Sequence, residues 1–374
     1  MMTKRRLNMV RGLALIAALA APVAMSLAQP GTLDPAIVTS NTLDASATQA
    51  IEAHASTWAP QLASTDPAAA SLARERLTRP LTTASASVAF RRAYSQALTP
   101  ALRGIAGGDD VGAKLGALRV AGLLATDEAS EILLDALKSD DESVRLFAAS
   151  QLGESLRATS AGTPAVTPEG VDEIVRALGQ QIASAKNPLE AAAAVRALAL
   201  ATRIEHQGYG VVRNLASAQL GARTGERIRR MSSSSADELE LIVALEACTA
   251  GLNAVTAPTS RPDAEGTKQI IGMGGDLLAW ALARFIDGHM PPTGERGLEA
   301  QAVGAAENVI HFARQHAARL RNETPASNPS RIAQALRDGD DRSFRTAALE
   351  LLGREGVLVR EFGFSKDRFV DRKP

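Results

Sequence analysis

Five histidines are the residues in this sequence best suited to hold a metal ion. His311 and His316 lie five residues apart, which places them about 140° apart around a helix. A metal-binding pair on one helix needs a spacing of three or four, as in the His-Glu-x-x-His pattern, which the sequence lacks. The sequence therefore predicts no metal site at any histidine, and these are His54, His206, His289, His311 and His316.

The single cysteine and a glycine-rich segment are the next candidates for catalysis or cofactor binding. Cys248 lies in the apolar segment LIVALEACTAGL, where no basic residue within one helical turn could stabilise a thiolate. Residues 272–276 (GMGGD) follow no strand and lack the Lys-Ser/Thr ending of a phosphate loop. We expect a buried thiol and a continuous helix whose small residues allow close contact. The sequence predicts no catalytic residue and no cofactor.

Paired carboxylates could serve acid–base catalysis or bind calcium. The pairs Asp109-Asp110 and Asp140-Asp141 each precede a helical pattern, and neither belongs to the alternating acids of a calcium loop. An aspartate at such a position accepts hydrogen bonds from the free amides at the start of a helix. We therefore predict that both pairs cap helices.

The densest cluster of basic residues comprises Arg223, Arg227, Arg229 and Arg230. Positions 223, 227 and 230 share one face of a predicted helix. Two interpretations stay open. The arginines could form a solvated face beside Glu226. Alternatively, Arg223, Arg227 and Arg230 could form a patch that binds an anionic partner, either a protein or a cell-envelope polymer.

Composition limits the classes of function that the chain can have. It has 374 residues, of which 45% are hydrophobic and 3% aromatic, so it can bury a core and is unlike a disordered protein. Lys and Arg number 41, as do Asp and Glu. This balance argues against nucleic-acid binding, which depends on an excess of basic residues. A single cysteine excludes a disulfide within the chain.

Residues 1–28 have the features of a secretory signal peptide. Four basic residues up to Arg11 precede an apolar stretch over 12–21, and Ser26 and Ala28 are small residues before the predicted cleavage site. Removing these four from 41 basic residues leaves 37, against 41 acidic ones. We expect an exported protein, periplasmic or extracellular, without stable membrane insertion. An uncleaved N-terminal anchor is the alternative, and the richness in Ala and Arg looks bacterial.

The rest of the chain carries helix signals almost throughout. Apolar residues recur three and four apart among good helix formers, whereas no window of six keeps the alternation of a strand. Start signals such as Thr167-Pro168 and Asn187-Pro188, and stop signals such as Gly251, divide the pattern. The predicted parts are a loose N-terminus at 29–42, a helical-repeat domain at 43–252, a linker at 253–266, C-terminal helical repeats at 267–353 and an extended tail at 354–374.

One sequence pattern occurs twice in the chain. Residues 140–153 (DDESVRLFAASQLG) align with residues 340–353 (DDRSFRTAALELLG), and a weaker copy begins at Asp109. In both full copies an aspartate pair starts a helix, apolar residues form one stripe, and a closing glycine permits a left-handed turn. One helix pair cannot bury such a stripe alone, so neighbouring copies are expected to stack.

The stretch LLDALKSDDESVRLFAASQLGE at 133–154 resembles a HEAT repeat, with an apolar helix, an Asp-bearing turn, Val-Arg, paired Ala and Leu-Gly. The resemblance implies an all-α fold, namely a HEAT-like α-solenoid of stacked antiparallel helix pairs whose surface binds other proteins. It also implies that the turn aspartate and the following arginine bond to each other or to the next repeat. Between 205 and 330 the pattern fades, which leaves open a divergent helical bundle in the C-terminal half. The structural repeat positions are Asp141, Arg145, Gly153, Asp341, Arg345 and Gly353.

These features predict an exported helical-repeat protein that acts as a protein–protein interaction or scaffold module in the cell envelope. Its partner is expected to be a protein, and no catalytic site is apparent. Two alternatives stay open. One is an enzyme of unknown reaction, or an accessory subunit, built on a HEAT-like fold, which would show a deep pocket lined by ionisable groups. The other is a structural envelope protein that self-associates.

Overall fold

The computed structural model describes residues 32–82, 86–235, 237–325 and 331–370, and the predicted signal peptide lies outside them. Every regular element in this part of the chain is a helix, so the prediction of an all-α protein is confirmed. The N-terminal half contains α1 (Pro35–Thr39), α2 (Ala45–Trp58), α3 (Pro67–Thr82), α4 (Val88–Ala106), α5 (Val111–Leu124), α6 (Asp127–Ala136), α7 (Glu142–Ala161) and α8 (Pro168–Ser184). The C-terminal half contains α9 (Pro188–Ala201), α10 (Gly210–Arg230), α11 (Glu238–Thr256), α12 (Ala264–Ile286), α13 (Gly297–Leu320), α14 (Ile332–Asp338), α15 (Asp341–Leu352) and α16 (Val357–Phe362).

Side-chain caps start many of these helices. Thr167 and Asn187 each precede a proline, and their side-chain oxygens accept hydrogen bonds from the amides of Gly170 (3.1 Å) and Leu189 (2.8 Å). Each bond satisfies an amide that the helix leaves free and contributes about 1 kcal/mol. Aspartates cap α1, α2, α5, α7, α11, α12 and α15 in the same way. The predicted helix starts at 167 and 187 are therefore confirmed.

Two of the glycines that were expected to end helices lie inside them. Helices α7 and α11 continue past Gly153 and Gly251, so these two predicted stops are wrong. A Cβ at Gly153 would lie 3.4 Å from the Cβ of Ala197 in α9, so a small residue at this position lets α7 and α9 pack closely. Gly353 follows α15 as predicted, but its backbone is extended (φ −55°) rather than left-handed.

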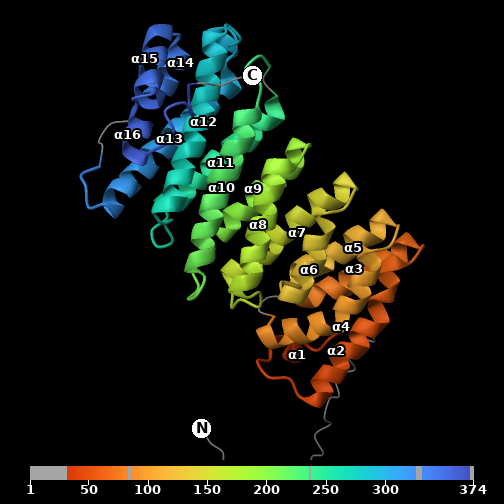
Figure 1. Cartoon of the computed structure of the whole chain (residues 1–374). Coiled ribbons are helices and arrows are strands. Elements are labelled where there is room, and N and C mark those ends of the chain that lie inside the picture. Colours follow the sequence, from red (N-terminus) through yellow and green to blue (C-terminus); the bar gives the residue numbers. More distant parts are fainter. Residues whose placement is uncertain (1–31, 83–85, 236, 326–330, 371–374) are drawn as a thin grey trace, which may run out of the picture.

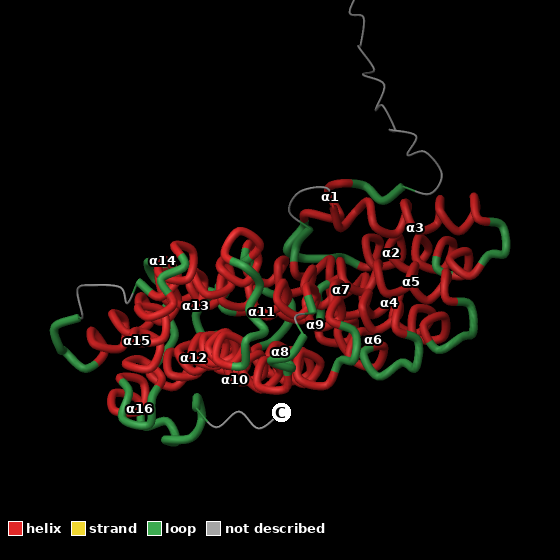
Figure 2. Tube along the Cα trace, turned by 90° about the horizontal axis from the view of Figure 1, so that it is seen from above, coloured by secondary structure: helices red, strands yellow, loops and turns green. Residues whose placement is uncertain are grey.

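The longer helices form two adjacent rows. Each even-numbered helix from α2 to α10 packs on the next even-numbered one, up to α12, and each odd-numbered helix from α3 to α11 packs on the next odd-numbered one, up to α13. Helices of consecutive number pack across the rows, as α8 does on α9. Figure 1 shows the helices following one another along an elongated molecule. Figure 2 shows α6, α8, α10 and α12 on one side and α7, α9, α11 and α13 beside them.

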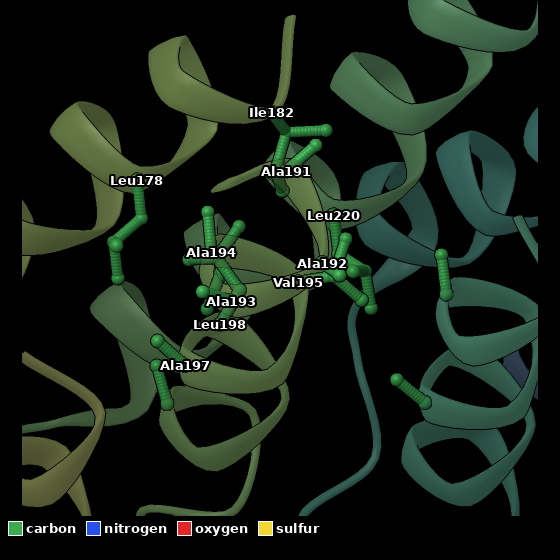
Figure 3. Packing of buried hydrophobic residues seen from close by; sticks show 14 of the residues in the cluster. Leu178, Ile182, Ala191, Ala192, Ala193, Ala194, Val195, Ala197, Leu198 and Leu220 are labelled. Atoms are coloured by element: carbon green, nitrogen blue, oxygen red, sulfur yellow. The ribbon is translucent and has the colours of Figure 1, made fainter. Parts of the chain in front are cut away.

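Alanines bring the two rows together in the middle of the molecule. Helix α9 buries Ala191, Ala194 and Ala197, and Figure 3 shows its alanines between Leu178 of α8 and Leu220 of α10. A methyl side chain adds little to the width of a helix, so three helices can approach one another here. The buried apolar side chains form one cluster that extends from α1 to the residues after α16.

The structure differs from the predicted divisions of the chain in its details. The predicted linker at 253–266 contains the end of α11 and the start of α12, with a loop only at 257–263. Beyond this loop, α12 and α13 pack on α10 and α11 and extend the same two rows. Short helices, α1 and α16, lie in the predicted loose N-terminus and extended tail. Such helices contain too few residues to display a helical period, which is why the sequence pattern did not reveal them.

The glycine-rich segment 272–276 lies within α12, as the sequence predicts, and provides the surface on which the C-terminal residues pack. A Cβ at Gly275 would lie 2.7 Å from a ring carbon of Phe369, and one at Gly272 would lie 2.7 Å from the guanidinium of Arg368. Phe369 is accordingly buried. The glycines therefore serve close packing, and the segment is continuous helix rather than a loop.

Helices α10 and α12 of the even-numbered row approach each other closely where they cross. A Cβ at Gly221 would lie 2.4 Å from the backbone carbonyl carbon of Gln269, so Gly221→Ala requires the helices to separate. We expect this substitution to lower the free energy of unfolding by about 1–3 kcal/mol, the usual cost of overpacking. Urea denaturation measures this change.

Gly104 in α4 provides the matched control for Gly221. It is exposed, and a Cβ there would meet no atom within 4 Å. Gly104→Ala is therefore expected to raise the free energy of unfolding by about 0.5–1 kcal/mol, because alanine favours the helix. Equal effects of the two substitutions would contradict the close approach of α10 and α12.

Candidate binding surface

The exposed side of the odd-numbered row is hollowed between α3 and α9. One hollow of about 700 Å³ lies along α7 and α9, and another of about 620 Å³ lies among α3, α5 and α7. Leu115 and Phe147 line both hollows, which therefore form one surface feature, here called the α3–α9 groove. It is defined by the residues that line the two hollows, and its apolar members are Leu115, Leu146, Phe147, Ala193, Ala197 and Leu200.

Small residues form the floor of this groove, and larger apolar residues form its sides. Gly153, Ala193 and Ala197 are buried beneath the hollow along α7 and α9. Phe147 and Leu200 are only partly buried and stand beside these small residues. A large apolar side chain from outside would fit into such a depression and cover apolar surface that now faces water. Contiguous apolar surface of this kind is typical of interaction sites.

Arginines outnumber acidic residues in the groove. Arg157 pairs with Glu154 at 3.4 Å, and Arg196 pairs with Glu246 of α11 at 2.6 Å. At the other end, the guanidinium of Arg119 contacts the amide oxygen of Gln151 at 3.4 Å. At this α3–α5 end two arginines, Arg74 and Arg119, accompany one carboxylate, Glu75, and both arginines contact neutral side chains. The charged lining residues are Arg74, Glu75, Arg119, Glu154, Arg157 and Arg196.

Sequence reasoning did not identify the α3–α9 groove. The apolar stripe predicted within residues 140–153 was expected to be buried, and it includes Phe147, whose ring the structure leaves partly exposed. The adjacent residues Leu146 and Phe147 widen the apolar face of α7 beyond the stripe that one neighbouring helix can cover. This broad apolar face was the sequence signal that could have indicated the groove. The contributions of α3 and α9 depend on how the helices stack, which local patterns do not specify.

In the first copy of the repeat, Arg145 reaches a neighbouring helix, as the resemblance implies, whereas Asp141 bonds within its own helix. The Asp141 side chain accepts hydrogen bonds from the amides of Ser143 (2.8 Å) and Val144 (3.2 Å) at the start of α7. Arg145 donates two hydrogen bonds, of 2.9 and 2.8 Å, to the buried carboxylate of Glu190 in α9. These bonds raise the pKa of Arg145. Asp141 therefore caps its own helix, and Arg145 joins it to the next odd-numbered helix.

The second copy keeps the cap but changes the other positions. Asp340, rather than Asp341, caps α15 by accepting a hydrogen bond from the Ser343 amide at 3.0 Å. Asp341 lies 3.6 Å from the guanidinium of Arg296, at the start of α13. Arg345 is exposed. The equivalence inferred from the aligned sequences therefore applies to the helix start and not to the arginine.

Arg227 does not belong to a surface patch. Its side chain is 7% exposed, and it donates hydrogen bonds of 2.7 and 2.6 Å to the two carboxylate oxygens of Glu240 in α11. It also donates to the backbone carbonyl oxygens of Ile182 (3.1 Å) and Ala185 (2.7 Å). The guanidinium thus joins α10 to α11 and to the end of α8. The predicted anionic docking patch is corrected on this point, because neighbouring helices cover the face that the sequence left open.

The two other members of the predicted patch also have partners within the protein. Arg223 lies 3.2 Å from the carboxylate of Glu226 on its own helix, and Arg230 donates a hydrogen bond to the carbonyl oxygen of Ala183. A hollow of about 410 Å³ opens beside Arg227 and Arg230. Its two carboxylates are engaged as well, because Glu240 binds Arg227 and Asp237 caps α11.

The groups considered first for chemistry lie in separate places. His54 and His316 are buried, which lowers the pKa of each, and their Nε2 atoms lie 3.2 and 2.8 Å from the carbonyl oxygens of Arg76 and Pro262. Cys248 is buried in α11, and this burial raises its pKa to about 12, so that the thiol stays protonated. Among the residues that the structure describes, no three His, Cys, Asp or Glu side chains are grouped as metal ligands would be.

Helix α11 is long and apolar enough to cross a membrane, and it is the one described helix that meets this test. Half of its apolar window is buried among the other helices. No protein-family model matches the chain, and no curated protein is similar to it in sequence. Inference about function therefore starts from the α3–α9 groove and its charges.

Proposed function

We propose that the chain is an exported, HEAT-like α-solenoid that binds another protein through the α3–α9 groove, as an interaction or scaffold module of the cell envelope. The two rows of helices support the solenoid, since each helix packs on its neighbours along and across the rows. The recurring cap residues at the starts of α5, α7, α9 and α11 also support it. Export is proposed from residues 1–28 alone.

The observation that carries the binding function is the apolar composition of the groove. Phe147, Leu146 and Leu200 are partly exposed around a floor of small residues, in hollows of about 700 and 620 Å³. Burying apolar surface contributes roughly 25 cal/mol per Å², so a partner that covered these side chains would gain stability. A protein partner can supply large apolar side chains in a fixed arrangement.

Site-specific photo-crosslinking in the native cells tests this proposal. A photoreactive amino acid replaces Ser150, which is exposed within the groove, or Ser56, which is exposed on α2 outside it. We expect a crosslinked protein of defined mass from position 150 and none from position 56. Equal yields at the two positions, or none at 150, would remove the groove as the binding site. A product containing two copies of this chain would favour the self-associating alternative.

A further inference from the structure

We propose that the segment that fills the α3–α9 groove is an amphipathic α-helix of a partner protein, with acidic residues toward the α3–α5 end. This inference rests on the proposed function and names the chemistry of the partner. Three features of the groove carry it, namely its direction and small floor residues, the helical backbone that surrounds it, and the distribution of charge.

The larger hollow follows the axes of the helices that form it. Its lining residues on α7 run from Ser143 to Arg157, which at 1.5 Å per residue spans roughly 21 Å. A partner helix of about 14 residues has the same length. Because Gly153 and Ala197 carry little or no side chain, they leave room above them for large side chains of that helix, as a hole between helices receives a knob.

The backbone around the groove favours a helix over an extended peptide. Every lining residue belongs to α3, α5, α7 or α9, whose backbone groups are largely bonded within their own helices. An extended peptide usually gains affinity from a strand edge, and a helix face offers none. A partner helix satisfies its own backbone and needs only side-chain contacts, as in other helix-in-groove complexes.

The charges orient the partner helix. At the α7–α9 end, Arg157 and Arg196 are already paired with Glu154 and Glu246. At the α3–α5 end, Arg119 contacts the neutral side chain of Gln151, and Arg74 lies 3.3 Å from the Ser71 hydroxyl. A carboxylate that replaced either neutral contact would form a charge-assisted hydrogen bond, which is roughly twice as strong. Acidic residues of the partner are therefore expected beside Arg119 and Arg74.

A displayed library of random peptides of about 18 residues, selected on the full chain, tests this inference. Peptides that also bind Ser150→Trp are discarded, because tryptophan at this exposed position fills the hollow. We expect the remaining sequences to carry apolar residues at helical spacing and acidic residues along one side of that apolar stripe, the side that faces α5 and α3. Enrichment of basic or proline-rich sequences would overturn the inference. So would a selection in which every enriched peptide also binds Ser150→Trp.

Exchanging charges between the protein and the peptide then tests how the partner helix is oriented. The experiment uses one enriched peptide and a twin in which lysine replaces each acidic residue. Arg119→Glu is expected to weaken binding of the acidic peptide about tenfold and to strengthen binding of the lysine twin. Arg342→Glu, at an exposed position on α15, and Ser56→Trp should change neither affinity. Unchanged binding to Arg119→Glu would overturn the orientation.

The two experiments separate the failure of this inference from the failure of the proposed function. Photo-crosslinking at position 150 reports any protein that occupies the groove, whereas the peptide selection reports whether a helix suits it. If a crosslink formed at position 150 in cells but the selection enriched no helical peptides, the binding function would be supported and the helical partner would be refuted. Circular dichroism of each variant establishes that a loss of binding is not a loss of folding.

Discussion

Replacing Arg227 by alanine is expected to lower the free energy of unfolding by about 3–5 kcal/mol, the range found when one member of a buried ion pair is removed. The substitution leaves the carboxylate of Glu240 without its bidentate partner and the carbonyl oxygens of Ile182 and Ala185 without a donor. A loss of this size is a large part of the 5–15 kcal/mol that holds a typical domain together. Because the guanidinium joins α8, α10 and α11, the effect should extend through the middle of both rows.

Arg223 on the same helix provides the control for Arg227. Its side chain is 38% exposed, and its partner Glu226 lies one turn away, so Arg223→Ala is expected to cost less than about 1 kcal/mol. Unfolding of both variants in guanidinium chloride measures the difference in their free energies of unfolding. If Arg227→Ala were no more destabilising than Arg223→Ala, the guanidinium would not be holding these helices together. Arg227→Lys keeps the charge but cannot form the bidentate pair, and an intermediate loss is expected.

The arginines illustrate which features of this chain could be predicted from sequence. Spacing correctly places Arg223, Arg227 and Arg230 on one helix, but it does not show which neighbour covers that face. Helices α8 and α11 cover this face, and their contact with α10 depends on how all the helices stack. A charged residue can therefore look like a ligand-binding group in the sequence and be a structural one in the fold.

Local signals account for most of what was predicted correctly. Caps such as Thr167 and Asn187 act within a few residues of their own helix, so the sequence shows them directly. Gly153 failed as a stop signal because its size serves contact with α9, and such contacts cannot be recognised within one helix. The α3–α9 groove lies beyond prediction for the same reason, since its lining runs from Ser71 on α3 to Leu200 on α9.

Removal of the buried carboxylate of Asp276 is expected to cause the second largest loss of stability. It is 0% exposed in α12 and lies 2.6 Å from the guanidinium of Arg229 in α10 and 2.8 Å from that of Arg368, beyond α16. Asp276→Ala would leave these two cations close together without the acid between them. We expect the free energy of unfolding to fall by about 3 kcal/mol, at the low end of the range for buried pairs, because Arg229 is 38% exposed and water can solvate it in part.

A surface pair gives the scale for this loss. Asp172 and Arg176 lie one turn apart on α8, and the arginine side chain is 62% exposed. Asp172→Ala should therefore cost less than about 1 kcal/mol in the same denaturation experiment. Comparable losses for Asp172→Ala and Asp276→Ala would show that burial adds nothing to the interaction of Asp276 with the two arginines.

Asp276→Ala should also have a local effect that Arg227→Ala lacks. Arg368 anchors the residues after α16, and the rings of Phe364 and Phe369 beside it are buried against α12. Without the carboxylate, these residues are expected to detach more readily than the rest of the molecule unfolds. Hydrogen exchange over 357–370 measures this opening, and it should accelerate in Asp276→Ala beyond what the global loss of stability explains. Arg227 bonds to Glu240, Ile182 and Ala185 and to none of these residues, so faster exchange over 357–370 in Arg227→Ala should follow only from global unfolding. The same excess in both variants would show that Asp276 does not hold the C-terminal residues in place.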